Sequence, residues 1–253
     1  MAIPNLSLEN KVAIITGGSR GIGKAIALGF AEAGATIVVA GRTTADLENV
    51  VQEIKSLGQQ ALAVKTDIAV KTEVENMVKQ ALEEFGKIDI LVNNAAINIM
   101  RPLVELREEG WDKVMNVDLK GYFLCCQAVA KTMIEKRSGN IINIASTGAA
   151  KAAAGLGAYG ISKAGVVMLT QLLAVELAQY NIRVNAIGPS LVKTAFSQPI
   201  WSNPDVLKAV EASTPLGRIA DPEDIMSLAL FLASDASSYI TGQTIYIDGG
   251  TLA

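Results

Sequence analysis

Short apolar runs alternate with longer amphipathic stretches along this chain, and this alternation constrains its fold more than any other feature. The apolar runs are rich in β-branched residues and are predicted to be strands at 12–16, 36–40, 61–65, 88–93, 140–145, 182–187 and 244–248. Between most of them lie helical patterns that end in glycine, as helices often do, such as 23–34 and 71–86. Strands that are apolar throughout are buried on both faces, with helices on each side. We therefore predict an α/β fold, a doubly wound (Rossmann) parallel sheet of about seven strands.

The whole chain, residues 1–253, is predicted to form a single domain. Half of its residues are apolar, which is enough for a sizeable core, and it contains no Pro/Ser-rich linker, low-complexity tract or solenoid-length repeat. The stretch at about 188–218 breaks the rhythm with several prolines and two large aromatic residues, Phe196 and Trp201. We expect a substrate lid there, and a surface helix packed on the core is the competing interpretation.

Charge and hydropathy argue against several classes of partner. The net charge is −3, the sequence pI is about 5.2, and the basic residues are scattered, so a nucleic-acid surface is not expected. No apolar run approaches the roughly 20 residues that span a bilayer. The first ten residues, MAIPNLSLEN, lack the basic and apolar regions of a signal peptide. We therefore expect a cytoplasmic protein with no membrane or nucleic-acid partner.

The chain contains no histidine, which removes many kinds of active site. Ser-His-Asp triads, Cys-His dyads and HExxH zinc sites are all excluded, as is the usual general base near neutral pH. The two cysteines, Cys125 and Cys126, are adjacent, and we expect them to pack as small apolar residues rather than form a disulfide or a zinc site. No metal site is predicted, and acid–base chemistry must use Tyr, Lys, Asp, Glu or Cys.

A glycine-rich segment, TGGSRGIG at 16–23, follows the first predicted strand and opens a helix. Backbone N–H groups and the helix dipole then face one point, which suits a phosphate. The segment reads T-G-x-x-x-G-x-G and is similar to the cofactor turn of the short-chain dehydrogenase/reductase family. A glycine turn with a purely structural role is the competing interpretation. The resemblance implies a single doubly wound domain that binds NAD(P).

Further family motifs fall in order along the chain, so the resemblance covers essentially all of it. They include NNAA at 93–96, NAIGPSLVKT at 185–194 and YITGQTIYIDGG at 239–250. Carried over residue by residue, the resemblance implies cofactor contacts from Gly17, Ser19, Arg20, Gly21, Ile22, Gly23, Arg42, Asp67, Ile68, Asn94, Ala95, Tyr159, Lys163, Pro189, Val192 and Thr194. Ala96 and Ser190 depart from the family pattern, which usually has glycine at both. We expect Ala96 to be harmless because the other motifs are intact and its backbone need not have a positive φ.

The end of the second predicted strand indicates which dinucleotide is bound. NAD-binding folds usually place an acid there for the ribose 2′-hydroxyl, but this chain has Gly41 and Arg42, with no acid before Asp46. Arg42 could pair with a 2′-phosphate, and Arg20 would add a second positive charge. NADP(H) is therefore the preferred cofactor, and NAD(H) is the second possibility. In the competing interpretation both arginines are solvated surface residues.

Tyr159 and Lys163 lie four residues apart in the stretch AYGISKAG, on one face of a predicted helix. Tyr159 could give a proton to a carbonyl, and Lys163 could lower its pKa from about 10 and hold the cofactor ribose. Ser146, at the end of the fifth strand, could donate to the substrate oxygen. The resemblance implies that Asn116 is the fourth member, supporting a water chain to the lysine. Each residue alone has an ordinary structural explanation, but together they predict a catalytic site.

The predicted reaction is reversible reduction of a ketone or aldehyde to an alcohol with NADP(H). The expected substrate-pocket loops are mostly small or apolar, but Arg101 and Lys151 could pair with a substrate carboxylate, so a sugar-acid or 3-oxoacyl reductase is a second candidate. An epimerase or dehydratase on the same scaffold and a non-catalytic NADP(H) sensor are also candidates. The resemblance further implies a homo-oligomer, a dimer or tetramer, through helices at 110–136 and 157–179.

Overall fold

Seven parallel strands form the central sheet of the computed structural model, which describes residues 5–253. Their order across the sheet is β3-β2-β1-β4-β5-β6-β7. The strands are β1 (Val12–Thr16), β2 (Thr36–Gly41), β3 (Ala61–Lys65), β4 (Ile90–Asn93), β5 (Gly139–Ile144), β6 (Ile182–Pro189) and β7 (Thr244–Ile247). All seven predicted strands are confirmed, with ends that move by two residues at most. Residues 1–4, which belong to the stretch where no signal peptide was expected, lie outside the described residues.

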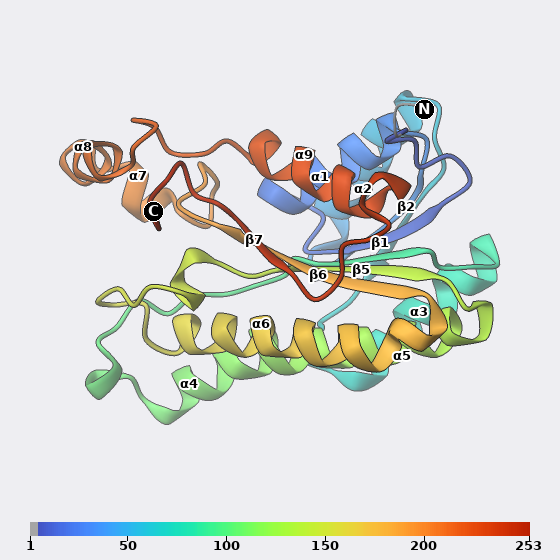
Figure 1. The fold of residues 1–253 in the computed structure, drawn as a ribbon, viewed down its shortest axis with the longest axis horizontal. Coiled ribbons are helices and arrows are strands. Elements are labelled where there is room, and N and C mark those ends of the chain that lie inside the picture. Colours follow the sequence, from blue (N-terminus) through green and yellow to red (C-terminus); the bar gives the residue numbers. More distant parts are fainter. Residues whose placement is uncertain (1–4) are drawn as a thin grey trace.

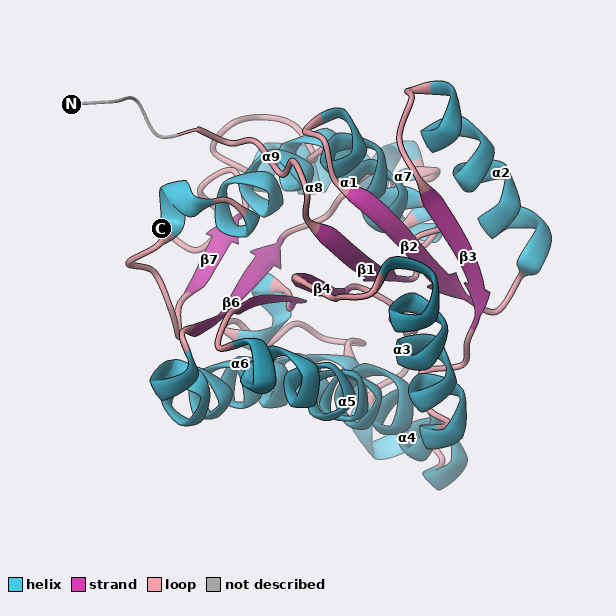
Figure 2. Cartoon of the chain, turned by 90° about the vertical axis from the view of Figure 1, so that its right-hand side faces the viewer, coloured by secondary structure: helices cyan, strands magenta, loops and turns pink. Residues whose placement is uncertain are grey.

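Helices cover both faces of this sheet in two layers (Figure 2). One layer contains α1 (Gly21–Glu32), α2 (Thr44–Ser56) and α9 (Pro222–Ala233). The other contains α3 (Lys71–Phe85), α4 (Glu108–Met115), α5 (Gly121–Lys136) and α6 (Gly157–Leu177). Two short helices, α7 (Gln198–Trp201) and α8 (Pro204–Ser213), extend from one end of the molecule (Figure 1).

The strands are apolar throughout because successive side chains enter two different cores. In β1, Ile14 packs in the core beneath α3, α5 and α6, whereas Ala13 and Ile15 pack in the core beneath α1, α2 and α9. All three side chains have no exposed surface. This burial on both faces is what the unbroken apolar runs of the sequence predict.

The chain reverses its direction of winding between β1 and β4, which are neighbours in the sheet. Connections leave the carboxyl ends of these strands toward opposite faces, and the resulting crevice is where open α/β sheets bind ligands. The glycine-rich turn follows β1, and the NNAA segment spans the end of β4. The fold therefore brings these two motifs to the same edge of the sheet.

Helices α4 and α5 are joined without a break by a π-helical turn at Asn116–Lys120. A π turn holds more residues than an α turn, so it changes which side chains face the sheet. Within this turn, Asp118 is completely buried. Turns of this kind occur often at functional sites.

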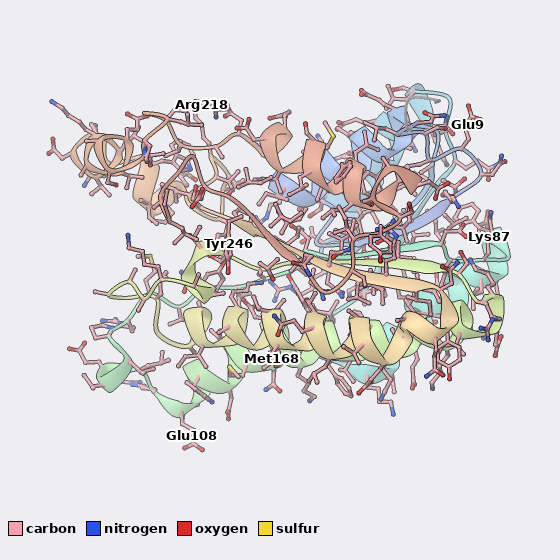
Figure 3. The ribbon with its side chains drawn as sticks, viewed as in Figure 1. Glu9, Lys87, Glu108, Met168, Arg218 and Tyr246 are labelled. Atoms are coloured by element: carbon pink, nitrogen blue, oxygen red, sulfur yellow. The ribbon has the colours of Figure 1, made fainter. Side chains whose placement is uncertain are left out.

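Helix α6 and the short turn after it, Gly157–Tyr180, are long and apolar enough by composition to cross a membrane, with a mean hydropathy of 1.5. In the structure this helix packs along β6 and α5 and carries the buried Lys163. Met168, in the middle of the helix (Figure 3), is about half exposed. The apolar composition of α6 therefore reflects its packing against the sheet and α5, and one side of this helix is left uncovered.

Candidate active site

A cavity of about 400 Å³ opens at the carboxyl edge of the sheet and extends from the glycine-rich turn to the α7 segment. Sixteen of the eighteen predicted site residues line it: Gly17, Ser19, Arg20, Gly21, Ile22, Arg42, Asp67, Ile68, Asn94, Ala95, Ser146, Tyr159, Lys163, Pro189, Val192 and Thr194. The two others, Gly23 and Asn116, are not among its lining residues. Residues from several strand ends and from the predicted lid thus meet in one place.

The glycine-rich turn has the geometry of an anion site. Gly17 and Gly21 have positive φ angles of 65° and 54°, a conformation that favours glycine. Arg20 precedes α1 and makes no side-chain cap, so the first N–H groups of the helix have no partner from that side chain. Gly23 lies under the turn and must lack a side chain, because a Cβ there would collide with the Gly17 carbonyl oxygen and the Asn94 amide. A pyrophosphate can therefore approach the free N–H groups of α1.

Asn94 fixes this turn to the neighbouring strand. Its side-chain Nδ2 donates to the carbonyl oxygens of Thr16, at 3.0 Å, and Gly17, at 3.1 Å. In return, Thr16 Oγ1 accepts from the backbone N–H groups of Asn94, at 3.0 Å, and Ala95, at 3.2 Å. Thr16 and Asn94 thus lock the two motifs together.

Among the described residues, non-glycine positive φ angles occur only at Asn10, Arg137 and Asn181, so Ala96 has the ordinary backbone that we expected.

Two arginines line the cavity beside the glycine-rich turn and the end of β2. Arg20 and Arg42 both line it, both are exposed, and neither forms an ion pair with another residue in the described part of the chain. The carboxylate of Asp67 also lines the cavity, and its Oδ1 accepts from the Ala69 N–H at 3.0 Å. This end therefore offers two free positive charges and one oriented acid.

Ser146 and Tyr159 meet where the cavity enters the domain. Ser146 follows β5, and its Oγ accepts from the Gly148 N–H at 3.1 Å, which fixes the direction of the hydroxyl. Burial raises the pKa of Tyr159 above its usual value of 10; the Asp118 carboxylate adds to this rise, and a hydrogen bond with Ser146 opposes it. The Phe196 ring covers Tyr159, with the ring centroids 6.0 Å apart. In the chain alone, Tyr159 is therefore held in its protonated form, and the expected lowering of its pKa by Lys163 is not found.

Lys163 reaches the same place from one helical turn further along α6. Its side chain is almost completely buried, and its Nζ donates to the Ile144 carbonyl oxygen at 2.9 Å and to Tyr122 Oη at 3.2 Å. An ammonium has three N–H donors, so one remains for a ligand in the cavity. Burial lowers the pKa of Lys163 below 10.5, and Asp118 opposes this fall.

Asn116, predicted as the fourth catalytic residue, begins the π turn, and its role in supporting a water chain to Lys163 stays a prediction. It does not line the cavity, and its side chain makes no hydrogen bond within residues 5–253. The π turn instead points Asp118 inward, with Oδ2 at 3.9 Å from Lys163 Nζ. The residue that this helix contributes beside the lysine is Asp118. The sequence signal for it was a lone acid in the apolar segment that follows Asn116.

The substrate end of the cavity is mainly apolar, with Ile97, Met100, Leu156, Phe196 and Ile200 among its walls. Asn98 also lines the cavity, but its Oδ1 is buried and has no hydrogen-bond partner in the described structure. Arg101 and Lys151 are both exposed and do not line the cavity. Their placement does not support the expectation that they bind a substrate carboxylate.

Comparisons with known proteins agree with this geometry. The family model described as Enoyl-(Acyl carrier protein) reductase matches residues 17–251. The (2S)-[(R)-hydroxy(phenyl)methyl]succinyl-CoA dehydrogenase subunit BbsD of Thauera aromatica is 42% identical over 97% of this chain and 98% of its own length. A short-chain type dehydrogenase/reductase from Mycobacterium marinum superimposes with a TM-score of 0.93, at 39% identity over 98% of this chain and 97% of that one. A gluconate 5-dehydrogenase from Burkholderia cenocepacia, solved with NADP and tartrate, has a TM-score of 0.95 at 34% identity over 98% of each chain.

Proposed function

This chain belongs to the short-chain dehydrogenase/reductase family, and we propose that it interconverts a secondary or primary alcohol and its carbonyl with NADP(H) as the preferred cofactor. The relatives are dehydrogenases and reductases that act on CH–OH or carbonyl groups, and this reaction class is also that of the present chain. The observation that carries the proposal is the meeting of Ser146, Tyr159 and Lys163 in a cavity that begins at the glycine-rich turn.

The side chains divide the work of carbonyl reduction between them. The dinucleotide, when bound, supplies the hydride. Ser146 donates a hydrogen bond to the carbonyl oxygen, and the Tyr159 hydroxyl gives that oxygen its proton. Lys163 stabilises the resulting phenolate with its positive charge and keeps one N–H for the dinucleotide ribose. In alcohol oxidation the same groups act in reverse.

The preference for NADP(H) over NAD(H) rests on Arg20 and Arg42. Both are free positive charges in the cavity, and a 2′-phosphate would give each a charge-assisted hydrogen bond. A carboxylate in place of Arg42 would repel that phosphate and bind a 2′-hydroxyl instead. The Burkholderia cenocepacia relative was solved in complex with NADP, which supports NADP binding here.

The walls of the cavity support an uncharged, largely apolar carbonyl substrate. Apart from Lys163 beside Tyr159, no basic side chain of residues 5–253 lines the substrate end, so an acidic group buried away from that lysine would remain unpaired. A thioester whose acidic groups stay in solvent meets this condition. We therefore rank thioester substrates ahead of free sugar acids. The name of the Thauera aromatica relative describes a dehydrogenase of a CoA thioester.

We also propose that the protein is a cytoplasmic homo-oligomer that uses the uncovered side of α6. Exposed apolar residues follow one another along that helix at Ile161, Met168, Leu172 and Val175, and Phe123 lies on the adjacent α5. A row of this kind along one face of a helix suits contact with a second copy. Sedimentation at micromolar concentration tests this, and a monomer would contradict it.

The function is tested by following NADPH and NADH absorbance with a panel of ketones, aldehydes, keto acids and 3-oxoacyl thioesters. We expect turnover with NADPH, fastest with neutral or thioester substrates, and its loss in Tyr159→Phe. Tight NADPH binding without turnover across the panel would instead support a non-catalytic sensor.

A further inference from the structure

Asp118 is a buried carboxylate that the reaction described above does not use. Its side chain has no exposed surface, and only one of its two oxygens is paired within the described residues. Oδ1 accepts from the Ile97 backbone N–H at 2.9 Å, whereas Oδ2 has no hydrogen-bond partner. Keeping an ionised carboxylate in an apolar interior is costly unless another charge compensates it.

The compensating charge is Lys163. Asp118 Oδ2 lies 3.9 Å from Lys163 Nζ, and both side chains are almost fully shielded from water. Two charges at this separation in a low-dielectric interior interact far more strongly than they would in water. The remaining titratable groups packed around the pair have raised pKa values and are neutral near pH 7: Tyr122, Cys125 and Cys126 on α5, and Tyr159 on α6. In residues 5–253, each charge of the pair therefore faces the other alone.

Asp118 also connects this pair to the wall of the substrate pocket. Ile97 follows the NNAA segment and lines the cavity, and its backbone N–H is held by the same carboxylate that faces Lys163. One side chain thus lies against both Lys163 and the loop that borders the cavity.

We propose that Asp118 is a positioning residue of this active site: its carboxylate is the buried counter-ion that keeps Lys163 charged, and it ties the Ile97 loop to that charge. The inference rests on the proposed function, because the charge of Lys163 serves the proton exchange of Tyr159. Asp118 acts through the lysine and touches neither the substrate nor the reacting atoms.

Removing this negative charge has a defined effect on proton binding. The Asp118 carboxylate raises the pKa of both Lys163 and Tyr159, so its loss lowers both. Carbonyl reduction needs a protonated Tyr159 and a charged Lys163. The alkaline limb of the reduction rate therefore moves to lower pH when the carboxylate is lost.

The first experiment compares pH profiles of kcat for NADPH-dependent reduction in wild type, Asp118→Asn and Asp112→Asn. Asn is nearly isosteric with Asp, and its amide oxygen can still accept from the Ile97 N–H. Asp112 is an exposed acid on α4, so its variant is the matched control. We expect the alkaline limb to move down by about one pH unit or more in Asp118→Asn and to stay in place in the control. A lower kcat at every pH, with no movement of the limb, would overturn the proposal.

A second measurement does not depend on activity. Urea unfolding of Asp118→Asn, Lys163→Met and the double variant forms a double-mutant cycle. Each single variant leaves one buried charge unpaired, so the unfolding midpoint of the double variant should lie above the value obtained by adding the two single shifts. Additive shifts would overturn the counter-ion role. If Asp118→Asn alone fails to fold, a folded double variant supports the pairing, and an unfolded one beside a folded Lys163→Met contradicts it.

The two failures are distinguishable. Absence of turnover in wild type would count against the proposed function, while the cycle would still decide whether the two charges are paired. Turnover in wild type with additive unfolding shifts would leave the function standing and remove Asp118 from it.

Discussion

Asn94→Ala is the substitution that most directly tests how the cofactor turn is held. The side chain donates from Nδ2 to the Thr16 and Gly17 carbonyl oxygens at 3.0 and 3.1 Å, and it is the only side chain in the described structure that bonds to both. Alanine removes both hydrogen bonds but keeps the backbone N–H of residue 94, which donates to Thr16 Oγ1. The turn then loses its cross-link to β4, while the sheet itself is unchanged.

The expected magnitude follows from these two bonds. A typical hydrogen bond contributes about 0.5–1.5 kcal/mol net, so losing two lowers the free energy of unfolding by about 1–3 kcal/mol. The turn must also be ordered again when a pyrophosphate binds, and that cost is at most of the same size. Since each 1.4 kcal/mol is tenfold in affinity, the Kd for NADPH should rise, by at most about a hundredfold.

The assay combines urea unfolding with a fluorescence titration of NADPH. Asn185→Ala is the matched control: it also loses two hydrogen bonds, from Nδ2 to the Ile240 oxygen at 2.8 Å and from the Gln243 N–H to Oδ1 at 3.1 Å, but it lies on β6 away from the turn. We expect both variants to be less stable and only Asn94→Ala to bind NADPH more weakly. An unchanged Kd in a destabilised Asn94→Ala protein would refute the reasoning.

Three further outcomes are expected. Arg42→Ala should weaken NADPH binding about tenfold, the effect of one exposed charge-assisted hydrogen bond, and leave NADH binding unchanged; equal losses for both dinucleotides, measured by titration, would contradict the phosphate assignment. Burial raises the pKa of Asp118 from 3.8 to about 6. Between these pH values the folded chain keeps this proton and the unfolded chain loses it. The free energy of unfolding should therefore fall as pH rises from about 3.8 to about 6, by up to about 3 kcal/mol. Urea unfolding across that range should show the fall in wild type, and a fall of the same size in Asp118→Asn would exclude this carboxylate as the cause. Phe196→Ala removes the ring that packs near Tyr159. It should raise KM for a bulky apolar carbonyl about five- to tenfold with NADPH affinity unchanged, because a partly buried phenyl contributes on the order of 1 kcal/mol. An unchanged KM would place Phe196 outside the substrate pocket.

Much of the fold could be predicted because its determinants are local. The run at 12–16 is a strand in the sequence pattern and in the structure, and the glycines at 17 and 21 have the positive φ angles that a tight turn requires. Burial on both faces of the sheet follows from apolar residues at consecutive positions. Sixteen of the eighteen predicted site residues line one cavity because parallel strands bring their carboxyl ends to one edge.

The residues that were missed depend on contacts between distant segments. Helical periodicity places Asn116 and Asp118 on faces set by an ordinary α-helix, and it does not anticipate the π turn that rotates Asp118 toward Lys163. The lock between Asn94 and Thr16 joins residues 78 positions apart. The position of Arg101 outside the cavity is a property of loop geometry, which composition does not determine.

Deuteride transfer tests the central claim most directly, because it asks whether this cavity moves a hydride between the nicotinamide and a carbonyl. NADPH carrying deuterium on the transferring face is incubated with the best carbonyl from the panel, and the product is analysed by mass spectrometry. We predict deuterium on the former carbonyl carbon with wild type, and essentially none with Tyr159→Phe at matched cofactor occupancy. Bound NADPH with no deuterium in any product, or undiminished transfer by Tyr159→Phe, would contradict the account.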